Sequence, residues 1–204
     1  MQKYFSTVTL ALMSIAIVLN VVVGQIVFGL QIPVYLDSIG TILVGILAGP
    51  IAGAVVGLLS NVVAGLITGT TITWFTIVSV VIGILAGLIG SRGWIRNIGL
   101  TLLGALITGV IAASISALIQ AYLLGGITGG GTDFITAFYL NQTGNVVTAS
   151  LLQGYTVDPL DKIISFLVVF FVVRGMSRRL LVRFPQGERS AEPRRDPLIG
   201  RTQR

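Results

Sequence analysis

The charged side chains that could do chemistry inside this chain form one small group. Asp158, Asp161 and Lys162 open an apolar run, and the spacing from Asp158 to Lys162 allows an ion pair on one helix face. Asp158 followed by Pro159 is also typical of a helix start, with Asp as the N-cap and Pro in the first turn. Helix capping plus an ion pair is the simpler interpretation of this group, and a polar site at membrane depth is the alternative.

Amide and aromatic side chains supply the larger set of candidates. An amide buried in an apolar helix without a partner is costly, so such groups should face one another or a wet cavity. Aromatic rings can stack on a planar ligand while amides fix its orientation. For any single amide, helix-to-helix bonding is an equally good explanation. The expected ligand contacts are Asn20, Gln25, Tyr35, Asp37, Asn61, Trp74, Gln120, Tyr122, Asn141, Asn145 and Lys162.

Most catalytic and metal sites need residues that this chain lacks. It has no cysteine and no histidine, which excludes disulfides, thiolate chemistry and nearly every transition-metal site. The sequence shows no Walker loop, no Ser-His-Asp set and no metal-ligand cluster. We therefore expect a chain that binds a solute without enzyme activity, cofactor or metal, and that cannot power the movement of that solute.

The composition requires a membrane around these side chains. Of 204 residues, 54% are hydrophobic and only 10% are charged, and the mean hydropathy is +0.96. These values exclude a water-soluble globule, a coiled coil, a disordered chain and a nucleic-acid-binding protein. The net charge of +6 lies largely beside helix ends and in the last residues, which is typical of a topology signal.

Charge-free segments divided at their turn residues predict the helices. About 20 apolar residues cross a hydrocarbon layer of roughly 30 Å. We expect an all-α polytopic membrane protein with six transmembrane helices in a compact bundle, at about 4–30, 38–48, 50–68, 72–91, 98–124 and 158–178. The membrane domain then spans 1–183, with short helices or a lid in 125–157 between helices five and six. Residues 184–204 have the composition of a disordered cytoplasmic tail.

The distribution of charge predicts the orientation. On one side of the predicted bundle lie Lys3, Arg92, Arg96, Arg174, Arg178, Arg179 and Arg183. On the other side lie Asp37, Asp133, Asp158, Asp161 and Lys162. The positive-inside rule puts both termini of this multi-pass protein in the cytoplasm. The candidate ligand contacts then fall in the outer half, which predicts a pocket open to the outside and closed toward the cytoplasm.

Small residues at four-residue spacing indicate which helix faces approach one another. The third predicted helix repeats Gly53, Gly57, Asn61 and Gly65; the fourth repeats Ser79, Gly83, Gly87 and Ser91; the fifth repeats Gly104, Thr108, Ala112, Ser116 and Gln120. Such faces let helix backbones approach closely. A further stripe, Thr7, Ala11 and Ser14, lies in the cytoplasmic half of the first helix. It either seats that helix in the bundle or docks another membrane protein.

Three sequence features together resemble a known family. They are the loop from Pro33 to Thr41, the run Gly49-Pro50-x-x-Gly53-x-x-x-Gly57-x-x-x-Asn61, and Asp158-x-x-Asp161-Lys162. With six short glycine-rich helices, they resemble the substrate-binding S components of energy-coupling-factor (ECF) vitamin transporters over about residues 1–183. The resemblance implies a subunit that captures a vitamin or similar micronutrient near the outer surface. It also implies partners, namely membrane lipid, a transmembrane coupling protein and two cytoplasmic ATPases.

One feature departs from that family, and two other functions stay open. The family often carries two alanines four apart on the first helix for docking the coupling protein, whereas Ala11 and Ala16 are five apart. The stripe of Thr7, Ala11 and Ser14 could serve instead. The first alternative function is a membrane sensor or scaffold domain of a signalling system, suggested by the many small-residue faces. The second is a small intramembrane enzyme that would depend on Asp37 or Asp158.

Overall fold

The computed structural model describes residues 6–190, and every regular element in that range is helical. In chain order the elements are α1 (Thr7–Gly29), α2 (Ile39–Ala48), α3 (Pro50–Thr68), η1 (Thr70–Phe75), α4 (Thr76–Ser91), η2 (Trp94–Arg96), α5 (Ile98–Leu124), α6 (Asp133–Thr143), α7 (Val146–Gly175), α8 (Arg178–Leu181) and α9 (Gly187–Ser190). The short elements η1 and η2 are 3-10 helices. The predicted all-α class is confirmed for the described residues.

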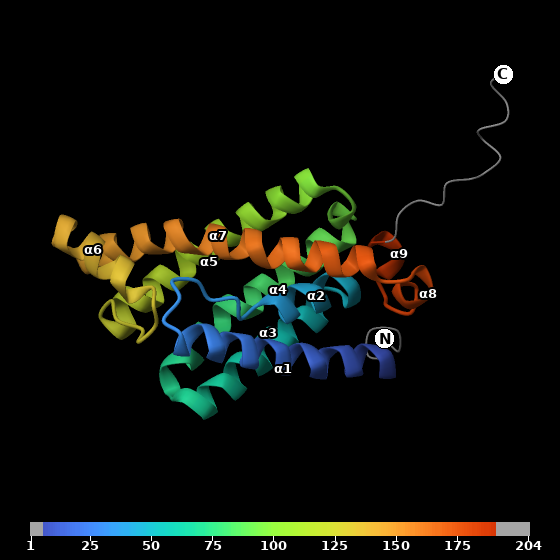
Figure 1. The fold of residues 1–204 in the computed structure, drawn as a ribbon, viewed down its shortest axis with the longest axis horizontal. Helices are drawn as coiled ribbons and strands as arrows, with labels where there is room; N and C mark the ends of the chain where they lie inside the picture. The colour runs from blue at the N-terminus through green and yellow to red at the C-terminus, as the bar shows by residue number, and fades with distance from the viewer. Residues whose placement is uncertain (1–5, 191–204) are drawn as a thin grey trace, which may run out of the picture.

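The long helices run between two distinct ends of the bundle (Figure 1). One end holds the start of α1, the turn between α4 and α5, and the helices α8 and α9. We call it the arginine end because Arg92, Arg96, Arg174 and Arg178 lie there. The opposite end holds η1, α6 and the loop before α6, and we call it the lid end.

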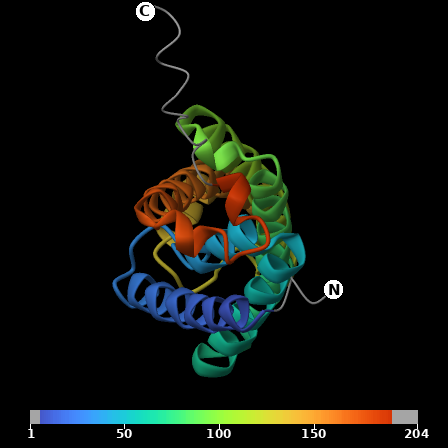
Figure 2. The same ribbon diagram turned by 90° about the vertical axis from the view of Figure 1, so that its right-hand side faces the viewer.

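Helix α2 is short and lies in the middle of the bundle. It contacts α1, α3, α4 and α7, and Figure 2 shows it between α1 and α7 when the bundle is viewed from one end. Eight of its ten residues are buried. At 1.5 Å per residue α2 is about 15 Å long, roughly half of a membrane crossing. The preceding loop, residues 30–38, therefore covers the part of the bundle that α2 leaves open.

The predicted glycine faces of α3 and α4 pack directly against each other. A Cβ atom added to Gly83 would collide with the backbone of Gly53, and one added to Gly57 would collide with the carbonyl of Ser79. On α2, a Cβ added to Gly45 would lie 2.8 Å from the carbonyl oxygen of Gly83. The interpretation of these stripes as close helix contacts is confirmed, because no side chain larger than hydrogen fits there without movement.

The predicted start of the last helix at Asp158 and Pro159 is wrong. Helix α7 begins at Val146, where the side chain of Asn145 accepts hydrogen bonds from the backbone N–H groups of Val147 and Thr148. Pro159 lies inside this 30-residue helix. Its backbone packs on α5, where a Cβ added to Gly109 would lie 2.6 Å from the Cα atom of Pro159. The second short helix expected within 125–157 is therefore the first part of α7.

The tail predicted from residue 184 is partly folded. Phe184 is buried, and the backbone N–H of Gln186 donates a hydrogen bond of 2.9 Å to the carbonyl of Leu47. The guanidinium of Arg189 donates one of 2.8 Å to the carbonyl of Ser91. Residues 184–190 thus cover the arginine end of α2 and α4. The remainder of the expected tail, 191–204, lies outside the described residues, and so does Lys3.

Four described segments are long and apolar enough to cross a membrane: Thr7–Gly29, Pro50–Thr68, Thr71–Ser91 and Ile98–Leu124. Helix α2 is apolar but shorter. Helix α7 has enough length, but it carries Asp158, Asp161, Lys162 and Arg174. The described chain therefore has several candidate membrane-crossing helices, and a count of six depends on treating α2 and α7 as the second and sixth crossings.

Candidate functional site

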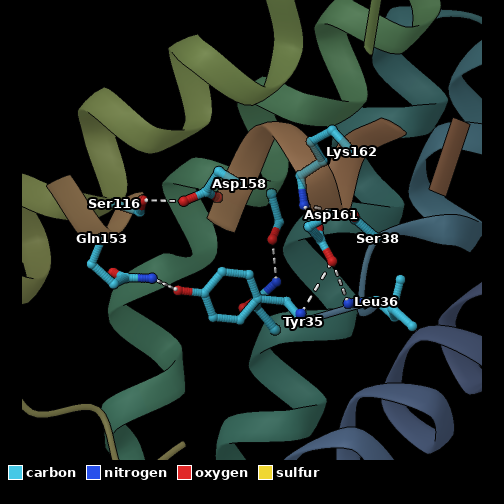
Figure 3. Close-up of polar contacts among 10 residues, drawn as sticks. Tyr35, Leu36, Ser38, Ser116, Gln153, Asp158, Asp161 and Lys162 are labelled. Carbon is cyan, nitrogen blue, oxygen red and sulfur yellow. Dashed lines mark hydrogen bonds and ion pairs between the residues drawn. The ribbon is translucent and has the colours of Figure 1, made fainter. Parts of the chain in front are cut away.

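Asp161 on α7 positions the loop between α1 and α2. Its Oδ1 atom accepts hydrogen bonds from the backbone N–H groups of Tyr35, at 3.1 Å, and Leu36, at 2.7 Å. Leu36 has a φ of 51°, a left-handed conformation that is uncommon for a non-glycine residue. The two hydrogen bonds hold the chain in this conformation (Figure 3). As a result, Tyr35 and Asp37 are directed into the bundle instead of lying on its surface.

The second oxygen of Asp161 pairs with Lys162. Oδ2 forms an ion pair with Nζ of Lys162, and this ammonium also donates a hydrogen bond of 3.0 Å to Oγ of Ser38 at the start of α2. Both charged side chains are buried. The desolvation cost of burying two charges is offset only when the geometry of the ion pair is good and further hydrogen bonds are made. This pair meets that condition, so it joins α7, the loop and the beginning of α2.

A cavity of about 130 Å³ lies between these groups and the lid end. Its polar wall includes Asn20, Tyr35, Asp37, Ser60, Asn61, Ser79, Ser116, Thr132, Asp158 and Lys162. Its aromatic and apolar wall includes Phe28, Ile32, Ile72, Phe75, Val78 and Ile82. Gly130 and Gly131 of the loop before α6 also line it. The volume is close to that of cavities of roughly 150 Å³ that hold one benzene ring.

Three cavity-lining side chains offer acceptor atoms that the protein leaves unused. Asn61 uses its Nδ2 atom, which donates to Oγ of Ser79 at 2.5 Å and to the carbonyl of Gly57 at 3.3 Å, while its Oδ1 has no hydrogen-bond partner among the described residues. Asp158 accepts a hydrogen bond of 3.3 Å from Ser116 through Oδ2 only. The carboxylate of Asp37 is in no ion pair within residues 6–190.

The surroundings of the loop residues shift their ionisation. Burial raises the pKa of the Asp37 carboxyl, and the nearby Lys162 ammonium offsets part of that rise. Burial also raises the pKa of the Tyr35 phenol, and the charge of Asp158 adds to the effect. The phenol is therefore neutral at physiological pH. Its hydroxyl accepts a hydrogen bond of 3.2 Å from Nε2 of Gln153 on α7.

Two predicted contacts are amides whose hydrogen bonds are largely made within the protein. Asn20 lines the cavity, but it donates to Thr41 and Ser60 at 2.9 and 3.0 Å and accepts from the backbone N–H of Gly40 at 2.7 Å. Gln120 does not line the cavity. It donates to Thr136 and to the carbonyl of Gly126, both at 3.0 Å. Asn20 therefore holds α1 against α2 and α3. Gln120 holds Gly126 and Thr136, which follow α5 in the chain, against that helix.

Other predicted contacts lie away from the cavity. The side chains of Trp74 and Tyr122 are 55% and 72% exposed, and neither lines it. Asn141 is exposed on α6, and Asn145 caps α7. Gln25 lines the cavity without a hydrogen bond in the described part of the chain. The structure thus gathers Asn20, Gln25, Tyr35, Asp37, Asn61 and Lys162 at one place, and leaves the other five outside it.

Sequence reasoning left several cavity residues out of the expected site. Asp158 belongs to the charged group noted in the sequence, but helix capping with an ion pair to Lys162 is the simpler interpretation, so the sequence does not single it out as a ligand contact. Ser79 and Ser116 lie on the small-residue stripes of α4 and α5, so their faces were predictable. Phe28, Phe75 and Thr132 carry no signal that separates them from ordinary core or loop residues.

The small-residue stripe on α1 points away from the bundle. Thr7, Ala11 and Ser14 are all exposed, whereas Met13 and Ala16 on the other side of the helix are buried. The hydroxyl of Ser14 donates to the carbonyl of Leu10 in its own helix. These three side chains do not seat α1 against its neighbours in the described chain, and they lie on one exposed helix face near the arginine end.

Comparison with known proteins supplies the family. A family model described as ECF transporter, substrate-specific component, matches residues 8–174. Members of this family are multi-pass membrane subunits of transporters, not enzymes; they bind small-molecule substrates and work with a coupling protein and ATPases. Comparison with curated proteins and with solved structures gives no match. The family match covers most of the chain, from α1 to α7, and this chain belongs to the substrate-specific components of ECF transporters.

Proposed function

We propose that this chain captures a vitamin-like small molecule in the cavity at the lid end and delivers it inward with a coupling protein and two ATPases. The observation that carries the proposal is the cavity itself. Side chains from α1, α3, α4, α5 and α7 and from two loops converge on it, and several of their polar atoms have no hydrogen-bond partner among residues 6–190. A set of buried acceptors around an open volume is typical of a site built for a ligand.

The distribution of charge supports capture from the extracellular side. The arginine end carries Arg92, Arg96, Arg174, Arg178, Arg179 and Arg183, and the positive-inside rule assigns such an end to the cytoplasm. With α2 and α7 as the second and sixth crossings, both termini are cytoplasmic. The lid end, where the cavity lies, then faces outward.

The exposed stripe on α1 is our candidate surface for the coupling protein. Thr7, Ala11 and Ser14 are small and lie in line near the arginine end, and small residues let two membrane helices approach closely. We propose that this face contacts the coupling protein, with the ATPases bound beneath it. The alternative is that this face of α1 contacts only membrane lipid.

The proposal is tested by identifying the bound compound and blocking its space. Small molecules that co-purify with the full chain are identified by mass spectrometry, and their uptake is measured in cells that also express a coupling protein and its ATPases. Ala64→Phe places a ring in the cavity wall and should abolish both retention and uptake. Leu66→Phe, at a position 83% exposed, is the matched control. Equal retention and uptake in the two variants would refute this cavity as the site.

A further inference from the structure

The hydrogen-bonding groups on the cavity wall are unevenly distributed between donors and acceptors. Asn61 is 4% exposed and Asp158 is 3% exposed, and each has an oxygen without a hydrogen-bond partner among residues 6–190. The one amino group on the wall, Nζ of Lys162, is already bonded to Asp161 and Ser38. Hydroxyl groups can donate or accept. Gln25 also lines the cavity without a hydrogen bond in the described chain, and its amide offers both donor and acceptor atoms. The fixed groups left for a ligand are therefore mainly, but not solely, acceptors.

The formal charge around the cavity is net negative, which also favours a ligand that donates hydrogen bonds. Asp37, Asp158 and Lys162 line it, and Asp161 lies directly behind Lys162. Three carboxylates thus surround one ammonium, and the only ion pair in the described chain, between Asp161 and Lys162, uses that ammonium. Asp37 and Asp158 form no ion pair with a cation among the described residues. Asp158 is buried and Asp37 is half-buried. A positively charged group that enters with the ligand would stabilise both carboxylates in their charged form.

The remaining wall restricts the body of the ligand. Phe28, Tyr35 and Phe75 line the cavity together with branched apolar side chains. Aromatic faces attract cations and stack on flat rings. The volume of about 130 Å³ is close to that of a cavity of roughly 150 Å³ that holds one benzene ring, so it favours a ligand with a single ring.

We propose that the cavity binds a small organic cation, with its positive charge on or next to a single flat ring, between the carboxylates of Asp37 and Asp158. Figure 3 shows Asp158 extending from α7 toward Ser116, with the ring of Tyr35 below it and the Asp161 and Lys162 pair to one side. The oxygen of Asn61 accepts a hydrogen bond from an N–H group of the ligand. This inference rests on the proposed function, whose site it specifies.

The test uses the purified full chain in lipid nanodiscs and three single-ring probes that differ in charge. They are benzylammonium, benzyl alcohol and phenylacetate, and their binding is measured by calorimetry. We expect benzylammonium to bind at least about tenfold more tightly than either of the others, because a charged hydrogen bond is stronger than a neutral one. Asp158→Asn and Asp37→Asn should each weaken benzylammonium about tenfold and leave benzyl alcohol unchanged.

The control variant is Glu188→Gln, which removes the same formal charge at the exposed arginine end. It should leave all three affinities unchanged. Benzyl alcohol binding in the two aspartate variants shows that the cavity is intact. Preference for phenylacetate, equal affinity for all probes, no benzylammonium binding at about 10 mM, or unchanged benzylammonium binding in both aspartate variants would each overturn the proposal.

The two proposals can fail separately. Probe binding needs no coupling protein or ATPase, whereas uptake needs both. Selective binding of benzylammonium without any uptake would refute the proposed function and leave the cation site standing. Uptake of a neutral or anionic compound that Ala64→Phe abolishes, with no charge preference among the probes, would refute the cation site alone.

Discussion

The Oδ1 atom of Asp161 accepts a hydrogen bond of 2.7 Å from the backbone N–H of Leu36 across 125 residues of sequence. This contact fixes the loop before α2, and the other oxygen of the same carboxylate neutralises Lys162. One buried side chain therefore determines both the shape of the cavity wall and its charge. Removal of the Asp161 side chain should therefore lower the free energy of unfolding and weaken ligand binding.

We expect Asp161→Ala to destabilise the protein by about 3–5 kcal/mol, because it leaves the buried Lys162 without a counter-ion. The double variant Asp161→Asn with Lys162→Met removes both charges and should recover a large part of that loss. Thermal unfolding in detergent, with the variants compared at one pH, measures both effects. If the double variant is no more stable than Asp161→Ala, the pair does not account for the destabilisation.

The contact between α3 and α4 should not tolerate a single methyl group. Gly83→Ala places a Cβ against the backbone of Gly53, which cannot move without separating the helices. We expect a loss of about 1–3 kcal/mol from overpacking, seen as a lower unfolding temperature. Gly29→Ala is the control, since a Cβ there meets nothing within 4 Å. Equal unfolding temperatures for the two variants would contradict this contact.

Binding of benzylammonium should weaken as the pH falls. The protonated Asp37 carboxyl is neutral, and its raised pKa brings that neutralisation above the ordinary aspartate range near pH 3.9. The charged groups that face it are Lys162, Asp161 and Asp158 of α7. Calorimetry from about pH 7 to about pH 5 should show a smaller loss of affinity in Asp37→Asn than in the unmodified chain. Identical profiles would show that Asp37 does not contribute.

A bulky side chain on the exposed face of α1 should separate uptake from binding. Ala11→Trp is expected to leave ligand retention unchanged and to reduce uptake at least about tenfold by preventing close helix approach. Leu106→Trp, on the exposed side of α5, is the control and should reduce neither. Uptake and retention are measured on the same cells. Normal uptake by Ala11→Trp would exclude this face as the coupling surface.

Local sequence signals predicted most helix limits because glycine and proline mark them. Gly49 and Pro50 separate α2 from α3, as expected, since Gly49 has a φ of 106° and Pro50 suits the first turn. The same signals failed at Asp158 and Pro159. There a tertiary contact with Gly109 on α5 lets the helix continue through the proline, and no local pattern reports such a contact.

The sequence indicated which end of the bundle the candidate side chains occupy, but not which of them face the cavity. Asn61 lies on a small-residue stripe, which indicated its face, and it does line the cavity. Trp74 and Tyr122 lie at the same depth but are exposed. Trp74 belongs to no small-residue stripe, and Tyr122, two residues after Gln120, lies off the stripe of α5, so the sequence does not assign either side chain an inward face. Asn20 and Gln120 point inward, but mainly to bond other elements, and the identity of an amide's partner cannot be deduced from its position.

Helix α2 lies between the loop that lines the cavity and the arginine end of the bundle. Ile42, Ile46 and Leu47 of this helix are fully buried, and residues 184–190 cover its far end, where Gln186 donates to the carbonyl of Leu47. Within residues 6–190, the packed side chains of α2 therefore separate the loop that lines the cavity from the arginine end. Under the proposed function, delivery of a solute from the cavity to the arginine side therefore requires either that α2 move aside or that the whole subunit reorient in the membrane.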